Sequence, residues 1–210
     1  LTRKTQNGTD ITTYTFDYEN KITRIDYPDE TYSAYKYDPL GRRIEKRDRS
    51  GNISRYVYEG HNFIGEYDGS NNLVASYVQG PGIDHPISMY RSAEMYWYHS
   101  DALGSIYQMT DSSEAVARGY DYSAFGKIIS ESGSLANPFT YTAREYDSDS
   151  GLYYYRARYY DANRKQRGRV YTLDCAAEFP LFCCARSQVL RGRQRVISEK
   201  KTLGKFFPST

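Results

Sequence analysis

The chain contains few of the residues that cross-link small domains, and it lacks the long apolar runs that cross membranes. Its 210 residues include 3 cysteines and 1 tryptophan. No apolar run approaches the ~18–20 residues that a membrane-spanning helix needs. The N-terminal end has no basic segment followed by an apolar one, so we expect no signal peptide in this chain and no membrane span.

The motifs of common metal and hydrolase sites are also missing. The sequence contains no H-E-x-x-H, no pair of C-x-x-C and no G-x-S-x-G. Cys175, Cys183 and Cys184 do not have the spacing of zinc ligands, and we interpret them as free thiols. His61 and His85 belong to no constellation. We therefore predict neither a metal nor a cofactor.

Tyrosine is the residue that the sequence has in excess. The chain holds 24 tyrosines beside 8 phenylalanines, and aromatic residues favour β-strands. A mean hydropathy of −0.78 is low enough to suggest disorder, but disordered chains are poor in aromatic residues. The composition therefore favours a folded β protein.

Charge divides the chain near residue 163. Residues 1–163 carry 17 Lys/Arg and 23 Asp/Glu, a net charge of −6, whereas residues 164–210 carry 11 and 3, a net charge of +8. All three cysteines lie in the second part. We predict that residues 164–210 form an irregular basic tail. That tail is the one part in which we consider binding to nucleic acid.

Pairs of aromatic residues at positions i and i+2 recur at steps of 19 to 24 residues. The pairs are Tyr14/Phe16, Tyr35/Tyr37, Tyr56/Tyr58, Tyr96/Tyr98, Tyr120/Tyr122 and Phe139/Tyr141, with Tyr77/Gln79 at the place of a further pair. A period of two puts both members on one face of a strand. Turn residues follow the pairs, as in Asp38-Pro39-Leu40-Gly41, which suits a type I turn.

Each unit of about 20 residues therefore predicts one antiparallel hairpin, with a tight turn at one end and a looser turn at the other. One hairpin cannot bury its own face, so successive hairpins must join and curl. We predict an all-β fold, in which repeated hairpins over residues 1–161 form one curved antiparallel sheet.

The segment Tyr35-Lys36-Tyr37-Asp38-Pro39-Leu40-Gly41-Arg42 fits the pattern Y-x-Y-D-x-x-G-R. It resembles the YD repeat of Rhs proteins and of their insecticidal-toxin and teneurin relatives. Residues 98–105 resemble the H-x-D-x-L-G-S block of the Rhs core, and residues 151–161 resemble its closing block. The motif residues that carry the resemblance are Tyr37, Asp38, Gly41, Arg42, His99, Asp101, Gly104 and Tyr160.

The resemblance implies an architecture and a role. Residues 1–95 would be YD/Rhs repeats, residues 96–163 the Rhs repeat-associated core, and residues 164–210 a divergent tail. In this family the repeats form a hollow β shell, which the core plugs and which encloses a C-terminal toxin used in competition between cells. The implied partners are the rest of the shell, the toxin segment, a secretion apparatus and an immunity protein. The implied location of the full-length protein is secreted or at the cell surface.

The resemblance also implies a self-cleaving site. The family core ends in a signature like Y-D-P-x-x-G-R-F-x-x-x-D-P, whose two aspartates resemble an aspartyl-protease pair. Asp161 and Asp174 match them, with Arg158 as a charge partner, because two carboxyls that share a proton can act as acid and base. The chain departs from the signature at Ala162, at Cys175 and in three additional residues before Gly168. A shift of reading frame or a genuine variable tail would each explain this, so enzymatic activity stays open.

Two further hypotheses concern single features. His99 and Asp101 on one strand face could bind each other or a metal, although fixing the turn before Leu103 and Gly104 is the favoured role. The tyrosine pairs could stack on sugars, which would make the chain a carbohydrate-binding or cell-surface-binding module. Packing between strands is the interpretation we favour for them.

Overall fold

The computed structural model of the chain describes residues 3–6 and 10–163, all within one compact unit. Strands follow one another along nearly all of these residues, and the one helical element among them is a 3-10 turn, η1 (Tyr141–Ala143). No helix in this part of the chain is long and apolar enough to cross a membrane. The prediction of an all-β fold is confirmed.

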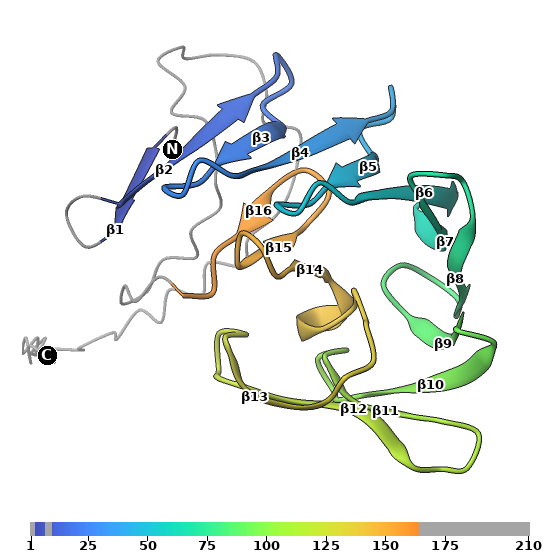
Figure 1. The fold of residues 1–210 in the computed structure, drawn as a ribbon. Coiled ribbons are helices and arrows are strands. Elements are labelled where there is room, and N and C mark those ends of the chain that lie inside the picture. The colour runs from blue at the N-terminus through green and yellow to red at the C-terminus, as the bar shows by residue number, and fades with distance from the viewer. Residues whose placement is uncertain (1–2, 7–9, 164–210) are drawn as a thin grey trace, which may run out of the picture. The chain divides into compact units, whose positions relative to one another are not determined.

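Thirteen strands form one antiparallel sheet, and each strand pairs with the next along the chain (Figure 1). They are β1 (Arg3–Gln6), β2 (Asp10–Phe16), β3 (Ile22–Asp26), β4 (Tyr32–Tyr37), β5 (Arg43–Arg47), β6 (Ile53–Glu59), β7 (Asn62–Asp68), β8 (Leu73–Gln79), β9 (Pro86–Arg91), β10 (Glu94–Ser100), β11 (Ile106–Thr110), β12 (Val116–Tyr122) and β13 (Ile128–Gly133). This serial order is the predicted meander of hairpins.

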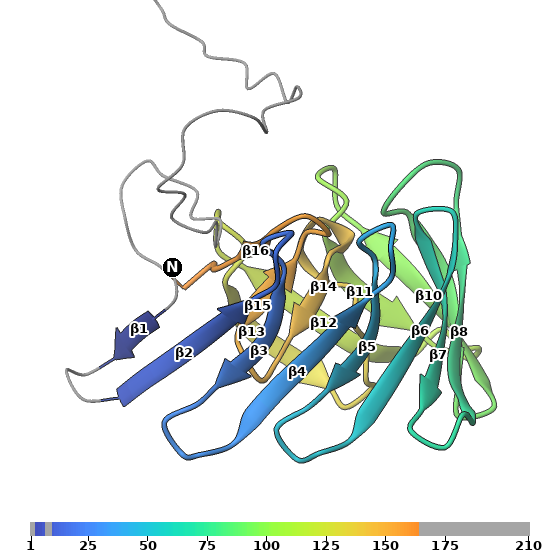
Figure 2. The same cartoon turned by 90° about the horizontal axis from the view of Figure 1, so that it is seen from above.

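A second sheet of three short antiparallel strands follows, made of β14 (Glu145–Asp147), β15 (Leu152–Tyr154) and β16 (Tyr159–Tyr160). The large sheet is strongly curved, and β14–β16 lie on its concave side (Figures 1 and 2). We call residues 137–163, which contain these strands, the inward segment. A single sheet leaves both faces uncovered, and here the inward segment covers part of the concave one.

Eight turns of the large sheet share one hydrogen-bond pattern. The first residue donates its N–H to the carbonyl four residues on, and its own carbonyl accepts the N–H three residues on. These turns begin at Asp17, Tyr27, Asp38, Asp48, Asp68, Asp101, Asp111 and Ser123, and in each the fourth residue has a positive φ. The turns at Asp38 and Asp48, the two ends of one hairpin unit, have the same bonds. The prediction of a looser turn at one end of each hairpin unit is therefore wrong, because the turns at both ends are closed by the same two hydrogen bonds.

The aspartate that begins such a turn caps it with its own side chain. One carboxylate oxygen of Asp38 accepts the N–H groups of Leu40 and Arg42 at 3.0 and 2.9 Å. Gly41 between them has a φ of 78°, the left-handed conformation that glycine adopts without a steric cost. The predicted turn from Asp38 to Gly41 is confirmed, and this capping explains why aspartate follows the tyrosine pair.

In three of the aromatic pairs, the second residue ties its strand to the preceding one. The hydroxyl of Tyr37 on β4 donates to the carbonyl of Ile22 on β3 at 2.7 Å. The hydroxyls of Tyr58 on β6 and Tyr122 on β12 donate in the same way to carbonyls of β5 and β11. The β3–β4 ladder already ends at the pair Arg24 and Ala34. The hydroxyl therefore satisfies a carbonyl that the ladder leaves without a partner.

Gln79 stands where the tyrosine of a further pair is due, and it preserves the same bond. Gln79 is on β8, and its side-chain amide donates to the carbonyl of Phe63 on the preceding strand, β7, at 3.0 Å. Glutamine and tyrosine share a donor at the end of a long side chain. Gln79 therefore supplies the donor that a tyrosine supplies in the pairs at Tyr37, Tyr58 and Tyr122.

The first residues of the pairs build the core from the concave face. Tyr14, Tyr35, Tyr77, Tyr96 and Tyr120 are all buried. The core has two clusters, and the inward segment enters both of them. Leu152, Tyr154 and Tyr159 join the cluster around β2–β4, and Phe139 joins the cluster around β7–β11. Packing between strands, the favoured role of the tyrosine pairs, thus describes their first members.

We predict that Asp38→Ala lowers the free energy of unfolding by about 1–3 kcal/mol, because it removes the acceptor of two backbone N–H groups and the ion pair to Arg42. Asp38→Asn keeps an acceptor oxygen and should lose less. Urea unfolding followed by circular dichroism measures both variants. An alanine variant as stable as the parent chain would show that the capping bonds do not stabilise the turn.

Candidate functional site

The concave face and the inward segment meet at a buried ion pair. A terminal nitrogen of Arg43 on β5 lies 2.6 Å from a carboxylate oxygen of Glu145 on β14. Arg43 is only 3% exposed. Its guanidinium lies 4.5 Å from the ring centre of Tyr154 and 5.5 Å from those of Tyr35 and Tyr56. The cation is thus held by one carboxylate and three aromatic faces, in place of water.

A second buried contact lies two residues further along β14. Asp147 is 1% exposed, and it accepts hydrogen bonds from the hydroxyl of Tyr35 at 2.7 Å and from Nζ of Lys46 at 3.0 Å. Burial alone would raise the pKa of Asp147. The positive charges of Lys46 and Arg43 and the bond from Tyr35 outweigh it, and the pKa lies below its ordinary value. Asp147 is therefore a buried carboxylate that the concave face keeps ionised.

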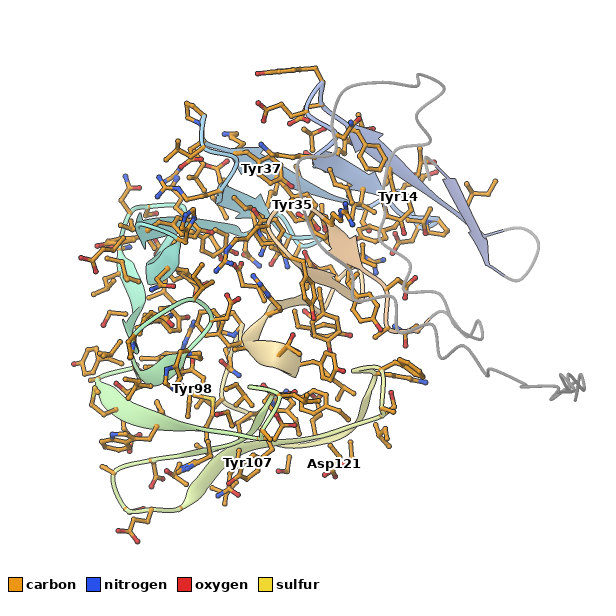
Figure 3. All side chains as sticks on the ribbon, turned by 180° about the vertical axis from the view of Figure 1, so that it is seen from behind. Tyr14, Tyr35, Tyr37, Tyr98, Tyr107 and Asp121 are labelled. Atoms are coloured by element: carbon orange, nitrogen blue, oxygen red, sulfur yellow. The ribbon has the colours of Figure 1, made fainter. Side chains whose placement is uncertain are left out.

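Tyrosine hydroxyls add a third set of contacts. The hydroxyls of Tyr37 on β4 and Tyr159 on β16 lie 2.9 Å apart, and the hydroxyl of Tyr154 accepts the backbone N–H of Arg43 at 3.1 Å. Figure 3 shows Tyr35 and Tyr37 on the strand that passes next to the inward segment. Because β4 and β5 bind β14–β16 through charges and hydroxyls together, the inward segment has one defined position on the sheet.

A smaller ion cluster lies directly before β14. Asp84 bridges two arginines, at 2.6 Å from Arg144 and 2.7 Å from Arg156. Burial raises the pKa of Asp84 in spite of these two cations. Asp84 and Arg156 have positive φ values of 64° and 58°. Two residues in this costly conformation meet in one ion cluster, which anchors the loop before β9 to the inward segment.

The YD motif residues have structural positions. Nε of Arg42 donates to Asp38 at 2.6 Å, and another nitrogen of Arg42 donates to the carbonyl of Gly60 at 2.7 Å. The guanidinium lies 5.2 Å from the ring centre of Tyr58. Arg42 therefore closes its own turn and joins it to the turn of the next hairpin. Together, Tyr37, Asp38, Gly41 and Arg42 hold neighbouring hairpins in register.

The block from His99 to Gly104 forms one of the eight tight turns. A carboxylate oxygen of Asp101 accepts the N–H groups of Leu103 and Ser105, both at 2.8 Å, and Gly104 has a φ of 79°. Nε2 of His99 lies 3.0 Å from the hydroxyl of Thr110 on the neighbouring strand. No group of three or more metal-ligating side chains occurs among the described residues. The turn-fixing role that we favoured for Asp101 is what the structure shows.

The residues of the proposed self-cleaving site lie at the end of the described chain. Asp161 directly follows β16, is 5% exposed and accepts the N–H of Asn163 at 2.9 Å. Arg158 is exposed, and the hydroxyl of Tyr160 donates to the carbonyl of Phe125 at 2.8 Å. Asp174 lies outside the described residues. The pairing of the two aspartates therefore stays a prediction.

The buried charges are the part of the site that sequence analysis missed. Arg43, Lys46, Glu145 and Asp147 carry no motif that marks them. One signal was available, because Glu145 and Asp147 stand two residues apart in an aromatic stretch and hence share a strand face. Two acids on one face of a short strand indicate a basic surface opposite.

A curved strip of β-hairpins, with the segment that follows the strip packed on its concave face, defines a β-repeat shell protein. Comparison with known proteins agrees with that class. The teneurin YD-shell family model matches residues 3–170 of the chain. The chain therefore belongs to the teneurin YD-shell family, and the resemblance found in the sequence is confirmed.

Individual relatives are much longer than this chain. It is 34% identical over 156 residues to the tRNA nuclease WapA of Bacillus subtilis, a match that covers 71% of the chain and 7% of that protein. It is 24% identical over 196 residues to the double-stranded DNA deaminase toxin A of Burkholderia cenocepacia, covering 77% of the chain and 14% of the toxin. The chain thus spans about a tenth of the length of these relatives.

Solved structures share the fold. The crystal structure of TcdB2-TccC3 superposes with a TM-score of 0.55 at 14% identity, over 72% of this chain and 9% of the matched one. A second TcdB2-TccC3 structure, with Cdc42 in its title, gives the same score over 8% of its chain. At this identity the likeness concerns the fold alone.

We predict that Arg43→Met lowers the free energy of unfolding by about 3–5 kcal/mol, because it leaves Glu145, whose side chain is only 12% exposed, without its partner. The double variant Arg43→Met with Glu145→Met should recover part of this loss. Urea unfolding of the full chain measures both.

The matched control is the exposed pair of Arg24 and Asp26, whose side chains are 45% and 41% exposed. Arg24→Met should cost less than about 1 kcal/mol. Equal losses for Arg43→Met and Arg24→Met would contradict the assignment of Arg43 as the residue that holds the inward segment.

Proposed function

We propose that this chain builds part of a β shell that encloses and presents a C-terminal toxin segment in competition between cells. The observation that carries the proposal is the inward segment. The chain turns back after β13, and ion pairs at Glu145 and Asp147 fix the inward segment to the concave face. Whatever follows Asn163 therefore starts from the concave side of the sheet.

The relatives support a cargo at this end. Their names describe a tRNA nuclease and a DNA deaminase toxin. The chain matches only 7% and 14% of these two relatives, which leaves most of their length for a segment that carries the named activity. For this chain, we infer the same division between a shell and a cargo.

The edges of the large sheet support further shell around the chain. β1 and β13 are the outermost strands, and within residues 3–6 and 10–163 each pairs on one side only. Unpaired strand edges bind further strands or aggregate. We propose that additional repeats complete the shell, and that a secretion apparatus and an immunity protein act on the assembled product, which is secreted or displayed at the cell surface.

Encapsulation predicts protection of the tail from protease. Residues 164–210 contain 11 lysines and arginines at which trypsin cuts. In a polypeptide that carries the additional repeats before Leu1, we expect tryptic cleavage within residues 164–210 to be at least tenfold slower than in the 210-residue chain, as measured by mass spectrometry over time. Equal rates would show that no enclosed space forms around this end.

A second candidate is the intramolecular aspartyl endopeptidase. Asp161 favours it, because this carboxyl is almost fully buried directly after the aromatic strand β16. Asp174 would supply the second carboxyl and Arg158 a nearby positive charge.

If Asp161 and Asp174 form the pair, Asp161→Asn and Asp174→Asn each abolish self-cleavage, since neither carboxyl works alone. Intact-mass measurement of the purified full chain detects the cleavage products. Asp121→Asn, which changes an exposed aspartate on β12, is the control and should cleave like the parent. Cleavage that persists in both site variants would exclude the pair.

The carbohydrate-binding alternative has less support. The first tyrosines of the pairs are buried against other strands, and so they present no face to a sugar. A sugar surface would require the outward residues Tyr90, Trp97 and Tyr107, which are 38–47% exposed. We therefore rank a carbohydrate partner below the shell and cargo.

A further inference from the structure

A small cavity lies between the ends of three hairpins and the inward segment. Its volume is about 20 Å³, which is room for one water molecule or one ion of similar size. Its lining residues include Arg42 before β5, and Arg144 and Arg156 of the inward segment. Guanidinium groups are the side chains that bind anions best, so three of them around one small space favour a negatively charged occupant.

The charges around the cavity do not cancel. The wall contains two acids, Asp84 and Glu145, beside its three arginines. Just outside the wall, Asp38 forms an ion pair with Arg42, and Arg43 forms one with Glu145. The wall and these direct partners thus hold four positive charges and three negative ones, which leaves one positive charge in excess.

Arg144 is the lining residue at which this excess is clearest. It shares the single carboxylate of Asp84 with Arg156, at 2.6 and 2.7 Å. Burial lowers the pKa of the Arg144 guanidinium, and the positive charge of Arg156 lowers it further, although the negative charge of Asp84 opposes both effects. Since arginine stays protonated in proteins, a further anion beside it would compensate the cost of burying its charge.

We propose that this cavity binds one small inorganic anion of charge −1, with chloride as the representative species. The anion supplies the missing negative charge and accepts hydrogen bonds from the guanidiniums in the wall. Its ligands come from Arg42 at the start of β5 and from Arg144 and Arg156 of the inward segment. The anion therefore joins the inward segment to the sheet at a second place, apart from the pair of Arg43 and Glu145.

Size and charge favour this occupant over the alternatives. A metal cation is disfavoured by the excess of positive charge. Phosphate and sulfate have four oxygen atoms and need more room than a space for one water molecule. A water molecule fits the volume but leaves the charge uncompensated, and it is the alternative that an experiment must distinguish. The inference does not depend on a toxin function.

Chloride binding to the full chain can be measured from the width of the chloride NMR signal, which broadens when the ion binds a protein. Sodium gluconate, whose anion is too large for the cavity, keeps the ionic strength constant. Arg144→Gln and Arg156→Gln each remove one positive charge from the wall. The matched control is Arg24→Gln, which removes the charge of an exposed ion pair on β3. The basic residues 164–210 are common to all variants, so differences between variants report on the cavity.

We expect Arg144→Gln and Arg156→Gln each to reduce the chloride broadening by roughly half or more, and Arg24→Gln to leave it unchanged. The Tm of the parent chain should be about 3 °C higher in chloride than in gluconate, because an ion that binds the folded state alone stabilises it. Both arginine variants should lose this difference in Tm.

A gain of charge tests the same site if an arginine variant fails to fold, as judged by circular dichroism. His61 is an exposed lining residue, and His61→Glu places a carboxylate next to the guanidiniums. This carboxylate should replace the anion, so the chloride broadening falls and the Tm in gluconate rises. His61→Gln, which changes the same position without adding a charge, should behave like the parent.

Two results would overturn the proposal. Equal broadening by the parent, Arg144→Gln and Arg156→Gln would mean that the cavity holds water and that any bound chloride lies elsewhere. Broadening that is the same in His61→Glu and His61→Gln would mean that the guanidiniums of the wall do not hold the ion.

Discussion

The ion pair between Arg43 and Glu145 joins residues 102 positions apart in the sequence, and the position of the inward segment depends on it. A one-layer sheet has no partner for its concave face, and its tyrosines alone cannot supply one. The inward segment supplies it, but it consists of strands of two or three residues. Such short strands do not fix their own position, so the buried charges and hydroxyls must do so.

This arrangement explains why polar groups occur inside a core of this kind. Buried ion pairs contribute little net stability when compared with apolar replacements, but they penalise every displaced arrangement strongly. Asp147 between Lys46 and Tyr35 has the same property. In a sheet of near-identical hairpins, apolar contacts alone would allow the inward segment to slip by one repeat. We infer that the buried charges specify one register of the inward segment on the sheet.

Features that depend on residues close in the chain were predictable from the sequence. The aromatic period of two predicted strands, and Asp38 to Gly41 predicted a turn, because both depend on residues close in the chain. The same local reasoning missed the second role of Tyr37, whose hydroxyl serves a carbonyl on the preceding strand. It missed Arg43 and Asp147 as well, because burial of a charge depends on a partner that no local pattern reveals. The pairing of Asp161 with Asp174 stays a prediction.

We infer that the inward segment and the curved sheet form one cooperative unit through these buried charges. Hydrogen exchange of the full chain with Asp147→Ala, followed by mass spectrometry, tests it most directly, with Asp121→Asn as the control. If they form one unit, the amides of β4 and β5 lose protection together with those of β14 and β15. Protection lost in β14 and β15 alone, with β4 and β5 unchanged, would contradict it.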